Sequence, residues 1–175
     1  MNGAVVMSLV VLALDLELLS AGVEVRPETP ADALDNRFPE HTVVQSYYLP
    51  TLRARLALIR NDPSRAIEAL QAAAPYELSS SGALYPVDVR GETYLVAHRG
   101  NEAAAAFQKI LDHRGIVVNA PIGALAHLGL GRAYALSGDK TRAKIAYQDF
   151  LTLWKDADPD IPVLKQAKAE YAKLN

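Results

Sequence analysis

The sequence predicts an all-α protein made of stacked antiparallel helix hairpins. Apolar and small residues recur at intervals of three and four, the period of amphipathic helices. One set of intervals between these residues occurs three times along the chain. A polar turn divides each copy into two helices of about a dozen residues. Because one hairpin cannot cover its own apolar face, we expect the hairpins to stack as a right-handed superhelix.

The amino-terminal residues 1–39 indicate a degenerate or truncated repeat. Residues 11–19 would form its first helix, and an apolar stripe would mark its second, which ends at Pro39. That stripe consists of Ala31, Leu34 and Phe38. The segment between the two contains Pro27 and Pro30, so it cannot be one continuous helix. The chain can therefore be a fragment of something longer.

Three repeat copies follow within residues 47–154. They span residues 47–75, 84–111 and 124–154. The clearest copy has a glycine, a tyrosine, an alanine and an aromatic residue in series, Gly131, Tyr134, Ala143 and Tyr147. Forty residues earlier the same series is Gly91, Tyr94, Ala103 and Phe107. A weaker copy lies another 37 residues upstream, with Ala54, Ala57, Ala66 and Leu70. Small residues in the first helices would let paired helices approach closely, and the aromatic rings would fill the seam.

Two glycines of the third copy have different expected roles. We place Gly131 on the seam of its hairpin and Gly129 off that seam, so that Gly129→Ala would be mild. In the first copy, Pro63 is well suited to open the second helix.

The carboxy-terminal residues 160–174 predict a capping helix. Asp160 is the expected N-cap residue, and Pro162 lies in the first turn. One face of the helix carries apolar residues, Leu164, Ala167, Tyr171 and Leu174. The end of a helical stack needs such a cover.

The repeat resembles the tetratricopeptide repeat, a unit of two helices and usually 34 residues. The matching features are Gly-x-x-Tyr in the first helix, a Gly-Asp turn and Ala-x-x-x-aromatic in the second. The family's early tryptophan is replaced by other residues, Pro50, Val87 and His127. Longer connections occur at 79–82 and 112–121.

More narrowly, residues 85–174 resemble the carboxy-terminal repeat region of large bacterial signalling proteins. The segments that carry this resemblance are 85–87, 107–111 and 147–151. In those relatives the repeats follow a serine/threonine kinase domain or a winged-helix DNA-binding domain. The resemblance implies a sensory or docking role in the bacterial cytoplasm, and it does not transfer kinase chemistry.

Composition excludes several function classes. The net charge is −2, which gives no strong attraction to nucleic acid. The chain has no cysteine, so disulfides and thiolate metal sites are excluded. The apolar run 4–14 is too short to cross a membrane and lacks the preceding basic residues of a secretory signal. We expect no membrane association, although the run could let the chain self-associate.

Catalytic and cofactor motifs are weak or incomplete. Gly129-Leu130-Gly131 lies inside a helical pattern and lacks the third glycine of a phosphate-binding loop. His-Arg-Gly occurs at His98 and His113, with glycine where a kinase catalytic loop needs aspartate. The histidines lack metal-ligand spacing, and His127 fits a packed helix face. We therefore predict no enzyme activity, no cofactor and no metal.

The best candidate site is a concave groove lined by the first helices of the hairpins. Repeat geometry predicts nine lining residues, Tyr48, Thr51, Arg55, Tyr85, Asp88, Glu92, Leu125, Leu128 and Arg132. Arg55 and Arg132 would flank Glu92 in a plus–minus–plus row suited to a mixed-charge or apolar peptide segment. Asp88 and Leu128 argue against the family's clamp for acidic peptide tails.

Three hypotheses for function remain. The first is a protein-interaction or scaffold module, the regulatory or docking part of a bacterial signalling protein, with a protein or peptide partner. The second is a self-associating structural repeat protein without a peptide ligand. The third is an accessory domain of an enzyme, left from a kinase or a transcriptional regulator.

Overall fold

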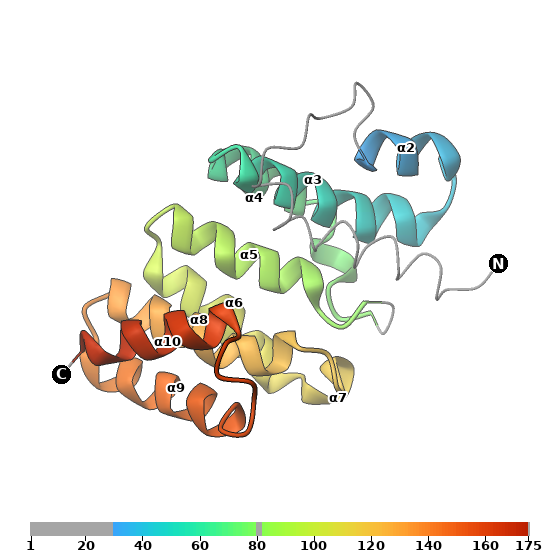
Figure 1. Cartoon of the computed structure of the whole chain (residues 1–175). Coiled ribbons are helices and arrows are strands. Elements are labelled where there is room, and N and C mark those ends of the chain that lie inside the picture. The colour runs from blue at the N-terminus through green and yellow to red at the C-terminus, as the bar shows by residue number, and fades with distance from the viewer. Residues whose placement is uncertain (1–29, 80–81, 175) are drawn as a thin grey trace. The chain divides into compact units, whose positions relative to one another are not determined.

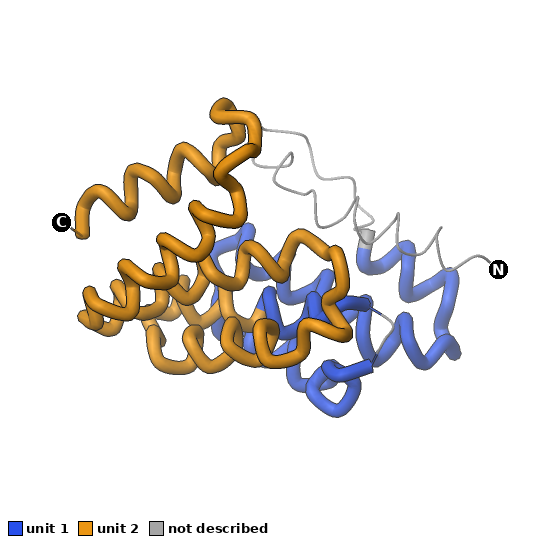
Figure 2. Tube along the Cα trace, turned by 90° about the horizontal axis from the view of Figure 1, so that it is seen from below, with its two compact units in different colours: residues 1–89 blue, residues 90–175 orange. Residues whose placement is uncertain are grey.

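The computed structural model describes residues 30–79 and 82–174, and all regular elements within these ranges are helical (Figure 1). The all-α prediction is therefore confirmed for this part of the chain. The expected first helix at 11–19 lies outside the described residues. The chain forms two compact units, residues 1–89 and 90–175, which Figure 2 colours separately. Each unit is described by itself.

Unit 1 contains the helices α2 to α4 and the start of α5. Its elements are α2 (Pro30–Arg37), a π-helical segment (Val44–Tyr48), α3 (Leu49–Ile59), α4 (Pro63–Leu70), a 3₁₀ turn (Ala74–Tyr76) and the first residues of α5 (Tyr85–Val96). The expected stripe on α2 is confirmed, since Ala31 and Leu34 are buried and Phe38 packs against their cluster. The predicted helix opening at Pro63 is also confirmed.

Helices α3 and α4 form the first hairpin (Figure 1). Ala54 and Leu70, sixteen positions apart, are both fully buried in one cluster with Val89. Ala57 and Ala66 complete that cluster. The seam of this hairpin is thus made of small and aliphatic side chains.

Unit 2 contains the remainder of the described chain. Its elements are the end of α5, α6 (Gly100–Asp112), α7 (Arg114–Val117), α8 (Ile122–Leu136), α9 (Lys140–Leu153) and α10 (Pro162–Ala172). Helix α8 packs against both α6 and α9. The short helix α7 lies within the long connection at 112–121, and its buried Val117 contacts the position of Gly123.

Glycines let two aromatic rings enter the seams of unit 2. A β-carbon at Gly91 would lie 2.7 Å from Phe107 Cε1, and one at Gly131 would lie 2.8 Å from Tyr147 Cδ2. Gly129 lies off the α8–α9 seam, as expected, but the expectation that Gly129→Ala would be mild is wrong. A β-carbon there would lie 2.6 Å from Phe107 Cδ1. Gly129 faces α6, so Phe107 packs between glycines of α5 and α8.

The three turns between paired helices share one backbone frame. The second residue after each first helix has positive φ: 56° at Asn61, 57° at His98 and 79° at Gly138. The next residue donates its amide to a carbonyl five positions earlier, at 2.9 Å (Asp62 to Ala57), 2.8 Å (Arg99 to Tyr94) and 2.9 Å (Asp139 to Tyr134). This is the hydrogen bond of a helix ending in a left-handed residue. The equivalent residues are 37 and 40 positions apart, as the sequence copies are.

Helix α10 covers one face of the last hairpin. Leu164 and Ala167 are buried in a cluster with Leu128, Tyr147 and Phe150. The predicted apolar face of this helix is confirmed. Asp160 is not the N-cap residue, because the helix starts one position later with Ile161 as N-cap. Asp160 instead pairs with Lys165, with 2.7 Å between Oδ1 and Nζ.

Candidate functional site

A charged pocket opens in unit 1 beside the first hairpin. Its volume is about 720 Å³, and α2, α3 and α4 supply its lining. The lining residues are Ala31, Asp32, Arg53, Leu56, Ala57, Arg60, Asp62, Arg65, Glu68 and Ala69. The lining therefore combines three arginines, three carboxylates and four apolar residues.

Arg53 is held in place by a polar network across three elements. Its Nη2 lies 2.6 Å from Asp35 Oδ2, and Gln45 Nε2 donates to Asp35 Oδ1 at 2.8 Å. Gln45 also donates to the carbonyl of Phe38 at 3.1 Å. Hydrogen bonds from Gln45 and then Arg53 lower the pKa of Asp35, so this carboxylate is ionised at neutral pH. The positive charge of Arg53 is thereby neutralised, and its side chain forms part of the pocket lining.

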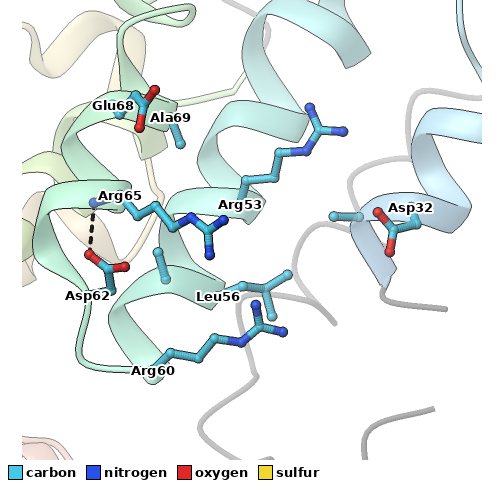
Figure 3. Close-up of a pocket in the computed structure, with 10 residues that line it drawn as sticks. Asp32, Arg53, Leu56, Arg60, Asp62, Arg65, Glu68 and Ala69 are labelled. Carbon is cyan, nitrogen blue, oxygen red and sulfur yellow. Dashed lines mark hydrogen bonds between the residues drawn. The ribbon is translucent and has the colours of Figure 1, made fainter. Parts of the chain in front are cut away.

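Arg60 and Arg65 present the other two guanidinium groups. Both side chains are exposed, and neither forms an ion pair with a residue that the structure describes. Figure 3 shows them extending in the same direction, toward the space beside Leu56. Asp62 lies between them in sequence, but its Oδ1 caps α4 by accepting from the amide of Arg65 at 3.0 Å. Two positive charges thus remain available to a ligand.

The corresponding place in unit 2 is occupied by the start of α6. In unit 2 the equivalents of Leu56 and Arg60 are Ala133 and Ser137. A β-carbon on Gly100, at the start of α6, would come within 2.8 Å of the Ala133 carbonyl oxygen. In unit 1 the described part of the helix before the hairpin, α2, lines the pocket with Ala31 and Asp32.

Three of the predicted groove residues are core residues instead. Thr51 and Leu128 are each only 1% exposed, and Tyr48 is 7% exposed. Thr51 Oγ1 donates to the carbonyl of Tyr47 at 2.6 Å within its own helix. Leu128 is covered by α10. The first-helix face that we assigned to a groove is partly an inner packing face, so these three assignments are wrong.

Arg132, the last residue of the predicted plus–minus–plus row, is already paired. Its Nε and Nη2 donate to the two carboxylate oxygens of Glu170 on α10, at 2.9 and 3.1 Å. Tyr147 donates to the same carboxylate at 2.9 Å. Arg132 thus fastens the capping helix, and a peptide would have to displace Glu170 to reach it.

The other predicted groove residues are partly exposed, and they remain predicted lining residues of the groove. They are Arg55, Tyr85, Asp88, Glu92 and Leu125. Within unit 1, burial raises the pKa of Asp88 to about 6, and the charge of Arg55 opposes that rise. Arg55 and Asp88 therefore act on each other electrostatically. Within unit 2, Leu125 packs against the α10 cluster.

The described ranges, 30–79 and 82–174, contain neither a metal-binding cluster nor a membrane-spanning helix. No cluster of three or more His, Asp or Glu side chains suited to a metal ion occurs there. His127 lies 3.7 Å from Asp149, and burial lowers its pKa. None of the helices placed by the structure has the length and apolarity needed to span a bilayer.

Sequence reasoning missed the three pocket arginines and Glu170. One signal was available, since Ala57 replaces the tyrosine that recurs at Tyr94 and Tyr134. A missing large side chain predicts either collapse or a hollow, and the pocket occurs beside Ala57.

Comparisons with known proteins yield no further identification. No protein-family model matches the chain, and neither a curated protein nor a solved structure matches it.

Proposed function

We propose that this chain is a protein-binding module built from tetratricopeptide-type hairpins, and that the pocket of unit 1 is its binding site. The supporting observation is the pair of guanidinium groups, Arg60 and Arg65, which have no ion-pair partner among the described residues. Apolar side chains, among them Leu56 and Ala69, line the same pocket. Arginine beside apolar surface is a combination typical of protein-binding hot spots.

The repeated turn frame supports the tetratricopeptide part of the proposal. Three hairpins with one turn geometry and one spacing of small and large seam residues are what a stacked repeat array requires. Such arrays present surfaces to other proteins. A place in a bacterial signalling protein and in the cytoplasm stays a prediction from the sequence resemblance.

Charge reversal tests the proposed function. The intact chain and its Arg60→Glu/Arg65→Glu variant would each be used for affinity capture followed by mass spectrometry. We expect proteins that the wild type captures to be lost with the variant, while the melting temperature changes little because both side chains are exposed.

The matched control is Lys168→Glu/Lys173→Glu, which makes the same change in net charge on the exposed side of α10. Capture that is lost equally with this control reflects net charge alone. A partner set retained by the Arg60/Arg65 variant contradicts a binding site in this pocket.

A further inference from the structure

Two of the three hairpins place an arginine over a tyrosine of the first helix. In the third hairpin Arg142 Cζ lies 4.4 Å from the centre of the Tyr134 ring. In the second, Arg99 Cζ lies 4.8 Å from the centre of the Tyr94 ring. These distances are within the range of favourable cation–π contacts. The ring and the guanidinium occur together at the turn end of each hairpin.

The first hairpin keeps the arginine of the third hairpin and lacks the ring. Arg65 is the equivalent of Arg142, and Asp62 and Asp139 cap the two helices in the same way, at 3.0 and 2.9 Å. Ala57 stands where the tyrosine would be, and both Ala57 and Arg65 line the pocket. Because the turn frames agree, a ring at the place of the missing tyrosine would lie beside the Arg65 guanidinium.

The remaining lining residues indicate that a ligand of this pocket also carries a negative charge. Arg60 lies on the same side of the hairpin and forms no ion pair with a described residue (Figure 3). A carboxylate can accept two parallel hydrogen bonds from a guanidinium, which makes it the best complement for such a group. Three lining carboxylates, Asp32, Asp62 and Glu68, restrict how many negative charges a ligand can carry, so a highly acidic segment fits less well.

We infer that the pocket binds an aromatic side chain next to a single carboxylate, presented by a partner polypeptide. The aromatic ring would take the place left by Ala57 beneath Arg65, and the carboxylate would pair with Arg60. This inference rests on the proposed function and names the chemistry of its partner. The chain's own residues 1–29 contain no Phe, Tyr or Trp and cannot supply the ring.

Short blocked peptides test the two requirements separately. Acetyl-Tyr-Glu-amide would be titrated into the full chain and followed by two-dimensional NMR, with acetyl-Ala-Glu-amide and acetyl-Tyr-Gln-amide as matched probes. We expect each of the latter two to bind at least about tenfold more weakly, since each lacks one of the two interactions. Equal binding of all three peptides would overturn the inference.

Filling the pocket is the second test. Ala57→Tyr restores the residue of the other two hairpins and should abolish acetyl-Tyr-Glu-amide binding, whereas Ala57→Ser should retain it. Should Ala57→Tyr fail to fold, Arg65→Gln provides the same information, because this exposed side chain can be changed without disturbing the core. Undiminished peptide binding in the variant that folds would show that no ring enters this pocket.

Two other occupants give different results. If residues 1–29 cover the pocket, acetyl-Tyr-Glu-amide will not bind the full chain, and Arg60→Glu/Arg65→Glu will lower the melting temperature. If a second copy occupies it, light scattering will show a dimer that Ala57→Tyr dissociates. Either result overturns the inference. The proposed function and this inference can fail separately. If the Arg60/Arg65 variant loses its captured partners while Ala57→Tyr leaves peptide binding unchanged, the proposed function stands and the inference about the aromatic side chain is overturned.

Discussion

The first hairpin, α3–α4, and the third hairpin, α8–α9, have the same turn frame and differently filled seams. In the third, Gly131 admits the ring of Tyr147, and Tyr134 stacks with Arg142. In the first, the seam pair is Ala54 and Leu70. The third is also covered on one side by α10, where Arg132 and Tyr147 both bind Glu170. The first has an open pocket beside it.

This difference separates what determines the backbone from what determines the surface. Turn hydrogen bonds and N-caps reproduce the hairpin whether the seam contains rings or methyl groups. Side-chain volume then decides whether the neighbourhood of the turn is closed. The repeat can therefore lose a tyrosine at Ala57 and retain its geometry, with a hollow as the consequence.

The largest expected effects come from the glycines of unit 2. Gly131→Ala and Gly129→Ala should each cost about 1–3 kcal/mol in urea denaturation, since each new methyl group meets an aromatic ring. Gly115→Ala is the control, because nothing lies within 4 Å of a β-carbon there. Equal midpoints for all three variants would contradict the seam geometry.

Tyr147→Leu sharpens this comparison, because with Gly131→Ala it recreates the small–leucine pair of the first hairpin. We expect the double variant to cost less than the sum of its single changes, by about 1 kcal/mol. Gly129→Ala contacts Phe107 instead, so its combination with Tyr147→Leu should be additive. Additivity in both combinations would show that Gly131 and Tyr147 do not form one seam pair.

The next prediction concerns Asp88, which is equivalent to the buried Leu128 of the third hairpin. Burial raises its pKa from 3.8 to about 6, so folding penalises the charged form. This cost is absent below pH 3.8 and complete above pH 6, and stability falls as the pH rises between these values. A shift of that size corresponds to about 3 kcal/mol, and partial exposure reduces the expected cost to about 1–2 kcal/mol.

Asp88→Asn removes the charge and should stabilise the protein by about 1–2 kcal/mol at pH 7.5. The advantage should shrink as the pH falls through 6 and vanish near pH 4, as measured by thermal melts across that range. Asp112→Asn, at an exposed position on α6, controls for the change in net charge. A variant less stable than wild type at pH 7.5 would mean that attraction between Asp88 and Arg55 outweighs the burial.

The sequence predicted features that depend on local spacing. The helical class, the offsets between copies and the α10 face all follow from apolar periodicity, which neighbouring residues determine. The groove assignments depended on which helix covers which face, a tertiary property. Thr51 and Leu128 were misplaced for that reason, and Arg132 was misjudged because its partner Glu170 lies 38 positions away. The pocket depends on the side chains that α2, α3 and α4 bring together, and the intervals in the repeats do not encode that packing.

The smallest expected effects come from the helix caps that maintain the shared frame. Asp62 and Asp139 accept an amide hydrogen bond at the starts of α4 and α9, whereas Arg99 makes no side-chain cap at the start of α6. Asp62→Ala should cost about 1 kcal/mol, the usual value of such a cap. Asp139→Ala should lower the melting temperature at least as much, because Asp139 also pairs with Arg142 at 2.6 Å. Arg99→Ala should have the least effect.

Acid titration provides the internal check on this ranking. Hydrogen bonds from the amide and then the side chain of Arg142 lower the pKa of Asp139 below 3.8. Its stabilisation is therefore present above pH 3.8 and is lost as the pH falls through the folded-state pKa. The difference in melting temperature between Asp139→Ala and wild type should disappear in strong acid, while that of Arg99→Ala should not follow this course. If Arg99→Ala were as damaging as the two aspartate variants, side-chain capping would not be what maintains the common turn, and the agreement of the three frames would have to come from seam packing.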